Sequence, residues 1–172
     1  MAERERVDVV NEQNEVMYDV FKDEAHQQGL LHRTVISEVV NSRGEWLLVR
    51  QSSDRQDAGQ YVSPVGGHVR AGESEDEALK REAMEELHFK DFEYSFIGRV
   101  IHNRFVVGRQ ENHFFILYSI KSDSEPVLNE ESESHRYFSV DELRKEIVDN
   151  PQNFGDAFHF LVNTLLSDSL KS

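Results

Sequence analysis

Three glutamates, Glu82, Glu85 and Glu86, carry the strongest chemical signal in the sequence. If this segment is a helix, with 100° per residue, their carboxylates share an arc of about 100° on one face. Like charges at this spacing repel each other, and Arg81 cannot neutralise all three. A hard divalent cation with oxygen ligands can do so. The cluster therefore predicts a Mg²⁺ or Mn²⁺ site, although a solvated acidic helix face would give the same pattern.

The helix that must hold these glutamates has a clear start. Ser74 followed by Glu77 forms a capping box, so we expect a helix from there to about Leu87. Leu79, Ala83 and Leu87 recur every fourth residue and can pack on a sheet. The sequence thus predicts an amphipathic helix with its carboxylates beside a buried stripe.

The wider spacing resembles a known motif. Gly67, five residues, Glu73, seven residues and then the run from Arg81 to Phe89 match the Nudix box, G-x5-E-x7-R-E-U-x-E-E-x-G-U with U apolar. The one departure is His88, where the family usually has glycine. Because that glycine often caps the helix with a positive φ, we expect a different helix exit here.

The resemblance implies an α/β (α+β) fold in which a Nudix-type mixed β-sheet lies between helices. It also implies that a divalent ion is held against a diphosphate while water attacks phosphorus. Carried over to this chain, the ligands are Glu82, Glu85 and Glu86, with the backbone carbonyl of Gly66 as an addition. Arg81 resembles the arginine that orients these carboxylates, and Glu73 resembles the glutamate that anchors the preceding loop.

The general base is harder to place, because the family takes it from different loops. We favour Glu131, in the acidic run 129–134, and Glu130, Glu133 and Glu85 compete with it. A solvated acidic loop explains this run equally well.

Three arginines could bind substrate phosphates bidentately: Arg50, Arg70 and Arg33. Surface solubility explains each of them at least as well. Tyr61 or Phe105 could stack on a base, but a single aromatic residue near a strand is more often part of the core.

A second resemblance covers residues 7–86, which look like the isopentenyl-diphosphate isomerase branch of the same superfamily. That branch has an extra metal site, which implies His26, His32, His68, Glu111 and His113 as ligands here. Imidazole suits Zn²⁺ or Mn²⁺ better than Mg²⁺, but these histidines could also make ordinary hydrogen bonds. The isomerase's catalytic cysteine falls at Gly66, and the chain has no cysteine, which argues against isomerase activity.

Composition limits the remaining possibilities. The 172 residues show no linker, so we expect one domain over 1–172, with an N-terminal extension at 1–30 and the Nudix box at 66–89. A net charge of −14 argues against a nucleic-acid polymer as partner. The lack of cysteine and of long apolar runs favours a cytoplasmic protein with no membrane partner. A homodimer stays open.

Local patterns predict the other elements. We expect strands or hairpins at 7–20, 34–50, 61–65, 92–101, 112–120 and 136–139, and helices at 23–28, 140–148 and 156–170. A loop is expected at 129–134, and a segment containing Gly108 should connect the two long strands. Substrate choice should lie in loops such as 51–60 and 103–110.

The leading hypothesis is a Mg²⁺-dependent Nudix hydrolase of a small diphosphate, with a nucleoside diphosphate derivative as one candidate substrate. An isomerase-like enzyme of prenyl diphosphates and a non-catalytic nucleotide-binding module are the alternatives.

Overall fold

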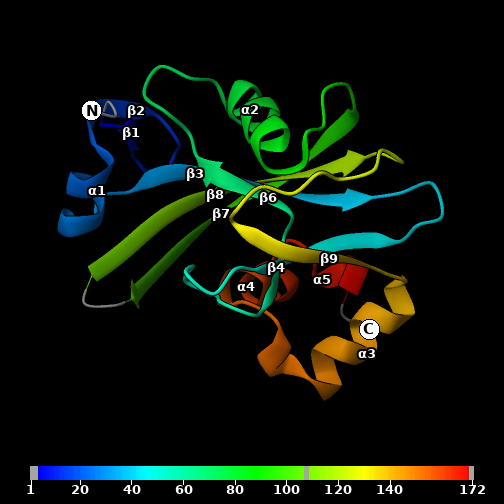
Figure 1. Cartoon of the computed structure of the whole chain (residues 1–172). Coiled ribbons are helices and arrows are strands. Elements are labelled where there is room, and N and C mark those ends of the chain that lie inside the picture. Colours follow the sequence, from blue (N-terminus) through cyan, green and yellow to red (C-terminus); the bar gives the residue numbers. More distant parts are fainter. Residues whose placement is uncertain (1–3, 107–108, 171–172) are drawn as a thin grey trace.

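The computed structural model describes residues 4–106 and 109–170, and within them nine strands form one mixed sheet with helices on both faces (Figure 1). The strands are β1 (Arg6–Val10), β2 (Val16–Phe21), β3 (His32–Val40), β4 (Trp46–Gln51), β5 (Tyr61–Val62), β6 (Val65–His68), β7 (Glu93–Val106), β8 (Arg109–Lys121) and β9 (Ser132–Phe138). The helices are α1 (Lys22–Gln28), α2 (Glu75–Leu87), α3 (Val140–Asp149), α4 (Asp156–Asn163) and α5 (Ser167–Leu170), with a short 3₁₀ turn at Pro151–Asn153. The expected fold class is confirmed.

Strand β3 organises the sheet, because it pairs with four other strands. It runs parallel to β8 and antiparallel to β1, β4 and β6. Alternate residues of β3 therefore face opposite cores. Val35 and Val39 pack with α2, whereas Ile36 packs with α3, α4 and α5.

Helix α2 forms as its sequence indicates. The Ser74 hydroxyl oxygen accepts a hydrogen bond from the Glu77 backbone N–H, and the Glu77 carboxylate accepts one from the Ser74 backbone N–H, which completes the capping box. Leu79, Ala83 and Leu87 are fully buried against the sheet. The flank beside this buried stripe presents the glutamates toward β6.

The expectation of a different helix exit at His88 was wrong. His88 has φ 59° and ψ 31°, the left-handed conformation that glycine would adopt at this position. Its ring Nδ1 lies 2.9 Å from the Val127 carbonyl oxygen, and this contact helps a non-glycine residue to hold the turn. The helix therefore ends in the same way without glycine.

The N-terminal extension is a hairpin followed by a short helix, as expected. Strands β1 and β2 pair antiparallel, and β1 joins the sheet through Val9, which pairs with His32 of β3. Helix α1 ends at Gly29, whose φ of 65° is easy for glycine. These contacts place α1 beside the start of β3.

Several boundaries differ from the expectations. The segment 103–110 is not simply a loop, because β7 extends to Val106 and β8 begins at Arg109; Gly108 lies outside the described residues. Strand β9 begins at Ser132, inside the expected acidic loop.

The expected helix 156–170 is split into α4 and α5. The side-chain hydroxyl of Thr164 donates to the Phe160 carbonyl, and its backbone leaves the helical region at φ −121° and ψ −93°. Such side-chain bonds compete with the helical backbone pattern.

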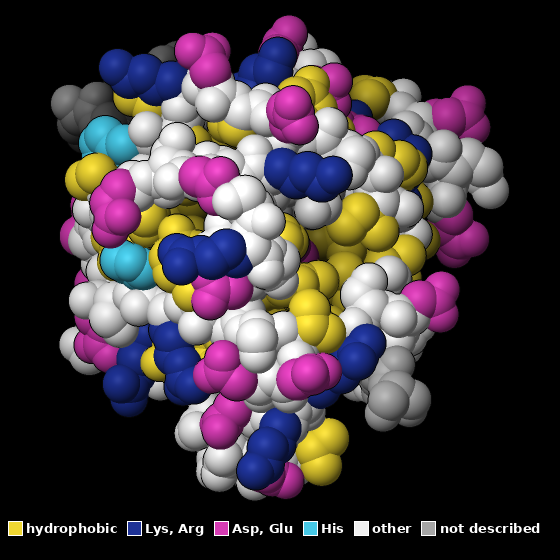
Figure 2. All heavy atoms as spheres, turned by 90° about the vertical axis from the view of Figure 1, so that its right-hand side faces the viewer, with side chains coloured by type: hydrophobic (Ala, Val, Ile, Leu, Met, Phe, Trp, Pro, Cys, Tyr) yellow, Lys and Arg dark blue, Asp and Glu magenta, His cyan; other side chains and the backbone are white. Residues whose placement is uncertain are grey.

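No helix within the described ranges is long and apolar enough to cross a membrane. On the face shown in Figure 2, acidic and basic side chains are interspersed around a hollow with hydrophobic side chains in it. This face therefore has no basic stripe.

Candidate active site

A cleft of about 470 Å³ lies beside β6 and receives side chains from both ends of the chain. Its acidic wall comes from α2 and from the segment before β9: Glu82, Glu85, Glu86 and Glu131. Its other lining includes Gly66, Gly67, His26, His68, His113 and Arg104. Most of the residues that the sequence singled out therefore meet at one site.

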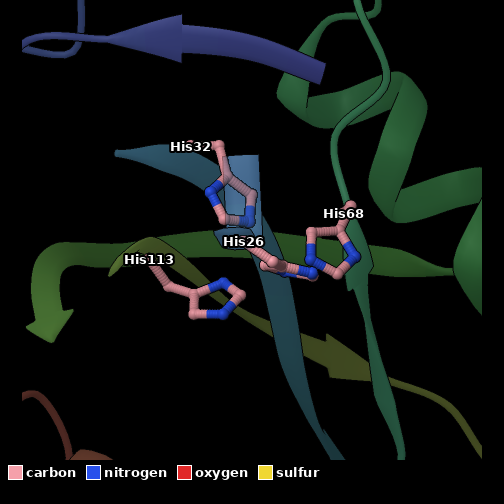
Figure 3. A group of neighbouring side chains, drawn as sticks. All are labelled: His26, His32, His68 and His113. Atoms are coloured by element: carbon pink, nitrogen blue, oxygen red, sulfur yellow. The ribbon is translucent and has the colours of Figure 1, made fainter. Parts of the chain in front are cut away.

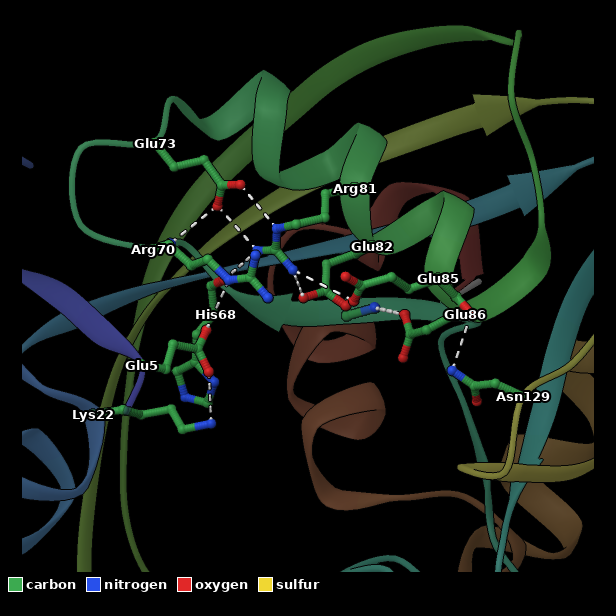
Figure 4. Close-up of polar contacts among 11 residues, drawn as sticks. Glu5, Lys22, His68, Arg70, Glu73, Arg81, Glu82, Glu85, Glu86 and Asn129 are labelled. Atoms are coloured by element: carbon green, nitrogen blue, oxygen red, sulfur yellow. Dashed lines mark hydrogen bonds and ion pairs between the residues drawn. The ribbon is translucent and has the colours of Figure 1, made fainter. Parts of the chain in front are cut away.

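Arg81 holds the box together (Figure 4). Its guanidinium donates to both carboxylate oxygens of Glu73, at 2.8 and 3.0 Å. It also donates to Glu82 Oε1 at 2.6 Å and to the His68 carbonyl oxygen at 2.9 Å. Arg81 thereby ties the loop before α2, the end of β6 and the first glutamate of the cluster to one another.

Gly67 lets α2 approach the strand. A Cβ atom at this position would overlap the Glu82 carboxylate, whereas one at Gly66 would find its nearest neighbour at 3.8 Å. The backbone N–H of Gly66 donates to Glu86 Oε2 at 2.8 Å. The two glycines thus bring backbone and carboxylates to the same point.

The cluster holds more negative charge than its protein surroundings neutralise. Burial raises the pKa of Glu82 to about 7, partly opposed by the hydrogen bond from Arg81. Burial also raises the pKa of Glu86, and neighbouring acids add to the effect. Glu85 is half-exposed, with Arg81 Nη1 at 3.5 Å. Carboxylate oxygens whose charge is not fully neutralised are the ligands that Mg²⁺ and Mn²⁺ prefer. The residues present therefore fit such an ion.

Glu131 lies closer to this cluster than Glu130 and Glu133 do, and the third competitor, Glu85, belongs to the cluster. Glu131 lines the cleft and shares a side-chain hydrogen bond with Glu86, whereas Glu130 and Glu133 are not among the lining residues. Asn129 fixes the segment, since its side chain donates to the Glu85 carbonyl oxygen and accepts from the Glu131 backbone. Glu133 instead pairs with Arg50 at 3.3 Å.

The three arginines suggested as phosphate ligands lie in different places. Arg70 lines the cleft, with Glu5 at 3.5 Å. Arg50 does not line it and donates to the Gly59 carbonyl oxygen. Arg33 is buried between Asp8 and Glu75, so its side chain supports the fold and does not reach the cleft.

The two aromatic residues suggested for stacking on a base also lie in different places. Tyr61 packs against Phe138 and Phe154 as part of a core. Phe105 is 72% exposed and does not line the cleft.

Four histidines from four elements converge next to the cleft (Figure 3). His26 comes from α1, His32 from β3, His68 from β6 and His113 from β8, and one ring nitrogen of each lies within 4.8 Å of the others. We call this group the histidine centre. Glu111 Oε2 lies 3.2 Å from His113 Nε2.

Two rings of the histidine centre, those of His32 and His68, favour the neutral form. His32 Nδ1 donates to the Leu30 carbonyl oxygen at 2.8 Å, which leaves its Nε2 as a lone-pair acceptor. That Nε2 and His68 Nε2 are buried without a hydrogen-bond partner among the described residues. Burial, followed by the neighbouring imidazoles, lowers the pKa of His32 to about 3 and that of His68 well below its ordinary value.

Sequence reasoning missed several residues that line the cleft. Lys22 comes from α1, Asp57 from the loop after β4, and Arg104 from β7. The sequence contained only a weak signal for Arg104. This residue lies directly opposite Glu111 in the β7–β8 hairpin, and the alternation of side chains along a strand does not reveal such a pair unless the register of the two strands is known.

Comparisons with known proteins agree with this geometry. The family model described as the NUDIX domain matches residues 30–158. A Nudix hydrolase of Deinococcus radiodurans is 30% identical over 126 residues, which cover 73% of this chain and 72% of that protein. Isopentenyl-diphosphate Delta-isomerase 2 of Photorhabdus laumondii is 28% identical over 84% of this chain and 82% of that protein.

The fold has solved counterparts as well. The crystal structure of DR0079 from Deinococcus radiodurans superposes with a TM-score of 0.73 at 23% identity, covering 92% of this chain and 98% of that one. The MutT protein of Methanosarcina mazei gives a TM-score of 0.65 at 22% identity, over 82% and 96% of the two chains. The chain belongs to the Nudix family, as a hydrolase that acts on a pyrophosphate bond.

Proposed function

We propose that this protein is a Mg²⁺- or Mn²⁺-dependent hydrolase that cleaves the diphosphate linkage of a small diphosphate by attack of water on phosphorus, with nucleoside diphosphate derivatives as one candidate substrate class. One observation supports this proposal above the others. Glu82, Glu85 and Glu86 converge on the cleft beside Gly66, with Arg81 as their main protein cation.

Each residue has a defined part in this proposal. Glu82, Glu85 and Glu86 hold the ion, and the Gly66 carbonyl adds a further oxygen ligand. When bound, the ion neutralises phosphate oxygens and makes water more acidic. Arg81 positions Glu82 and supports Glu85, and Arg70 meets a phosphate oxygen at the cleft wall.

Glu131 is our candidate for the general base. It lies in the cleft beside Glu86 and can accept a proton from water as the water attacks. Its backbone N–H donates a hydrogen bond to the Asn129 side chain, and the same side chain donates to the Glu85 carbonyl oxygen of α2. These two hydrogen bonds fix the position of Glu131 relative to the proposed metal ligands.

The isomerase reading has less support at the cleft. Moving a double bond in a prenyl chain needs an acid and a base at carbon. Gly66 stands where the isomerase branch places its cysteine, and the sequence contains no cysteine.

The histidine centre is proposed as a second metal site, separate from the carboxylate cluster. Four imidazoles suit Zn²⁺ or Mn²⁺ better than Mg²⁺. Glu111 beside His113 orients that ring and is a candidate further ligand.

We further infer a small-molecule substrate and a cytoplasmic location. The net charge of −14 opposes a nucleic-acid polymer, and a chain without cysteine suits a reducing compartment. A homodimer is compatible with this proposal and is not required by it.

A panel of diphosphates tests the proposal. Nucleoside diphosphates, nucleotide sugars, dinucleotides and prenyl diphosphates are incubated with about 5 mM Mg²⁺, a level chosen to saturate the site. The phosphate or phosphomonoester that is released is then measured. We expect turnover of at least one compound that stops with a chelator. Nucleotide binding without turnover would favour the binding module, and double-bond migration without phosphate release would favour the isomerase.

A further inference from the structure

Arg104 is a cleft residue with two side-chain N–H groups that make no hydrogen bond to the described part of the chain. It lies on β7, lines the cleft, and its side chain is only 17% exposed. Its Nε and Nη1 atoms are buried without a hydrogen-bond partner among the described residues. The other Lys and Arg side chains of the cleft have acidic partners: Lys22 donates to Glu5, Arg70 lies 3.5 Å from Glu5, and Arg81 donates to Glu73 and Glu82. Buried guanidinium donors left without acceptors are costly, which points to an acceptor supplied by a ligand.

Arg104 stands apart from the carboxylate cluster within the same cleft. Gly66 pairs with Ile36, which pairs with Leu117 of β8, whereas Arg104 pairs with Glu111. Leu117 and Glu111 are six residues apart on one strand, which corresponds to roughly 20 Å between their backbones. The strand register therefore places Arg104 toward the other end of the cleft from the glutamates, where it can meet a more distant part of the same substrate.

The charges around Arg104 define what that part can be. Glu111 Oε2 lies 3.6 Å from its Nε and Asp156 Oδ2 lies 3.7 Å from its Nη1, both too far for a hydrogen bond. Asp57 faces the same group, and burial raises the pKa of this carboxyl although Arg104 opposes the shift. Among the described side chains, the carboxylates of Asp57, Glu111 and Asp156 face this guanidinium, which favours a neutral group over a second anionic group here. A neutral group with an acceptor oxygen can bond Arg104, and its own O–H or N–H can donate to Asp57 or Asp156.

An apolar tail is equally unsuitable at this end of the cleft. Phe115, Ala157 and Phe158 supply apolar walls, but a hydrocarbon packed there would leave the donors of Arg104 desolvated and unpaired. Sites built to hydrogen-bond a substrate reject an analogue that lacks the polar group.

We propose that Arg104 is a specificity-determining residue, which donates hydrogen bonds to a neutral acceptor on the organic part of the diphosphate substrate. This inference rests on the proposed hydrolysis. The shared chemistry is a neutral group with acceptor and donor side by side, and a sugar ring and a nucleobase both provide it.

The test compares uridine diphosphate, ribose 5-diphosphate and geranyl diphosphate as substrates of the parent, Arg104→Met and Arg104→Lys. We expect Arg104→Met to lower kcat/KM for the polar substrate by roughly 10- to 100-fold, mainly through KM, with little loss for geranyl diphosphate. Loss with uridine diphosphate alone assigns the contact to the base, and loss with both polar substrates assigns it to the sugar. Arg104→Lys keeps the charge and should recover part of the loss.

Arg50→Met is the matched control, because Arg50 does not line the cleft, and its kinetics should match those of the parent. Thermal melts of all variants verify that they fold. Equal kcat/KM for the polar and geranyl compounds in the parent, or an unchanged preference in a folded Arg104→Met, would overturn the role of Arg104 while leaving hydrolysis intact. No turnover of any diphosphate by the parent would instead refute the proposed function, and the inference with it.

Discussion

Glu131 and Glu133 are two residues apart but face different partners. Glu131 lines the cleft beside Glu86, whereas Glu133 pairs with Arg50 outside it. If Glu131 is the general base, Glu131→Gln should lower kcat by about 10²- to 10⁴-fold. Steady-state phosphate release measures this effect, and Glu133→Gln is the control, expected to stay close to the parent. Equal losses in both variants would assign the effect to the acidic segment as a whole and remove Glu131 from its role.

Glu38 is a fully buried carboxyl that the proposed reaction does not use. Burial raises its pKa to about 7 from 4.5, partly opposed by the hydrogen bond that Ser63 donates. Below pH 4.5 the group is protonated in both the folded and the unfolded chain. Between pH 4.5 and 7 the unfolded chain releases its proton first, so the folded state loses stability as pH rises.

Replacing Glu38 by Gln should remove this loss. Converting the difference between 4.5 and about 7 gives about 3 kcal/mol as an upper bound. We expect the free energy of unfolding of Glu38→Gln, relative to the parent, to increase by up to that amount from pH 5 to pH 8. Urea unfolding at the two pH values measures it, with the exposed Glu12→Gln as control. The same difference from the parent at both pH values would show that Glu38 titrates normally.

The close approach of α2 to β6 depends on Gly67, which has no side chain. Because a Cβ at Gly67 would overlap the Glu82 carboxylate, Gly67→Ala must push that glutamate away from its Arg81 contact. We expect a fall in kcat/KM of about 100-fold or more, since a displacement of about 1 Å at a reacting site can cost that much.

Gly66→Ala is the matched neighbour, because its Cβ has room and its backbone groups are unchanged. Steady-state kinetics should therefore show a much smaller loss for Gly66→Ala than for Gly67→Ala. Comparable losses in the two variants would show that chain stiffness, and not the approach of Glu82, requires glycine here.

Elements with local signals were predictable from sequence, and elements shaped by distant contacts were less so. The capping box at Ser74 starts α2 as expected, and α3 starts at Val140 as expected, behind a second capping box at Ser139. The helix exit at His88 was predicted wrongly, because the preference for glycine at this position takes no account of distant contacts. The His88 ring is held by the carbonyl of Val127, which lies 39 residues away in sequence. The break at Thr164 was missed because the apolar periodicity continues through it.

The histidine centre joins parts of the chain that lie far apart in sequence. A metal there would link α1 of the N-terminal extension to β3, β6 and β8. At 100 times the dissociation constant such an ion contributes about 2.7 kcal/mol, which raises Tm by roughly 5 to 10 °C.

We therefore expect Zn²⁺ to raise the Tm of the parent, and His68→Gln to lose most of that increase. Thermal melts with equilibrium dialysis measure stability and stoichiometry together. His135→Gln is the control, because His135 lies on β9 outside the centre. Equal Zn²⁺ responses in the parent and His68→Gln would exclude the histidine centre as the site.

The site as a whole was only partly predictable. The Nudix box could be found because its residues lie within 23 positions, and the histidines were found through a resemblance. Arg104, Asp57 and Asp156 come together only through the β7–β8 register and the placement of α4, which no local pattern encodes. Arg33 was misassigned for the same reason, since its partners Asp8 and Glu75 lie far from it in sequence.

The rate of Mg²⁺-dependent diphosphate cleavage in Glu85→Gln tests the central claim most directly. Glu85 is half-exposed, so its replacement should leave the fold intact, and Glu12→Gln controls for the loss of one surface charge. If the three glutamates hold the ion against the diphosphate, Glu85→Gln should release phosphate at least about 100-fold more slowly than the parent, and Glu12→Gln should match the parent. A folded Glu85→Gln that cleaves at the parental rate with the same Mg²⁺ dependence would contradict the account.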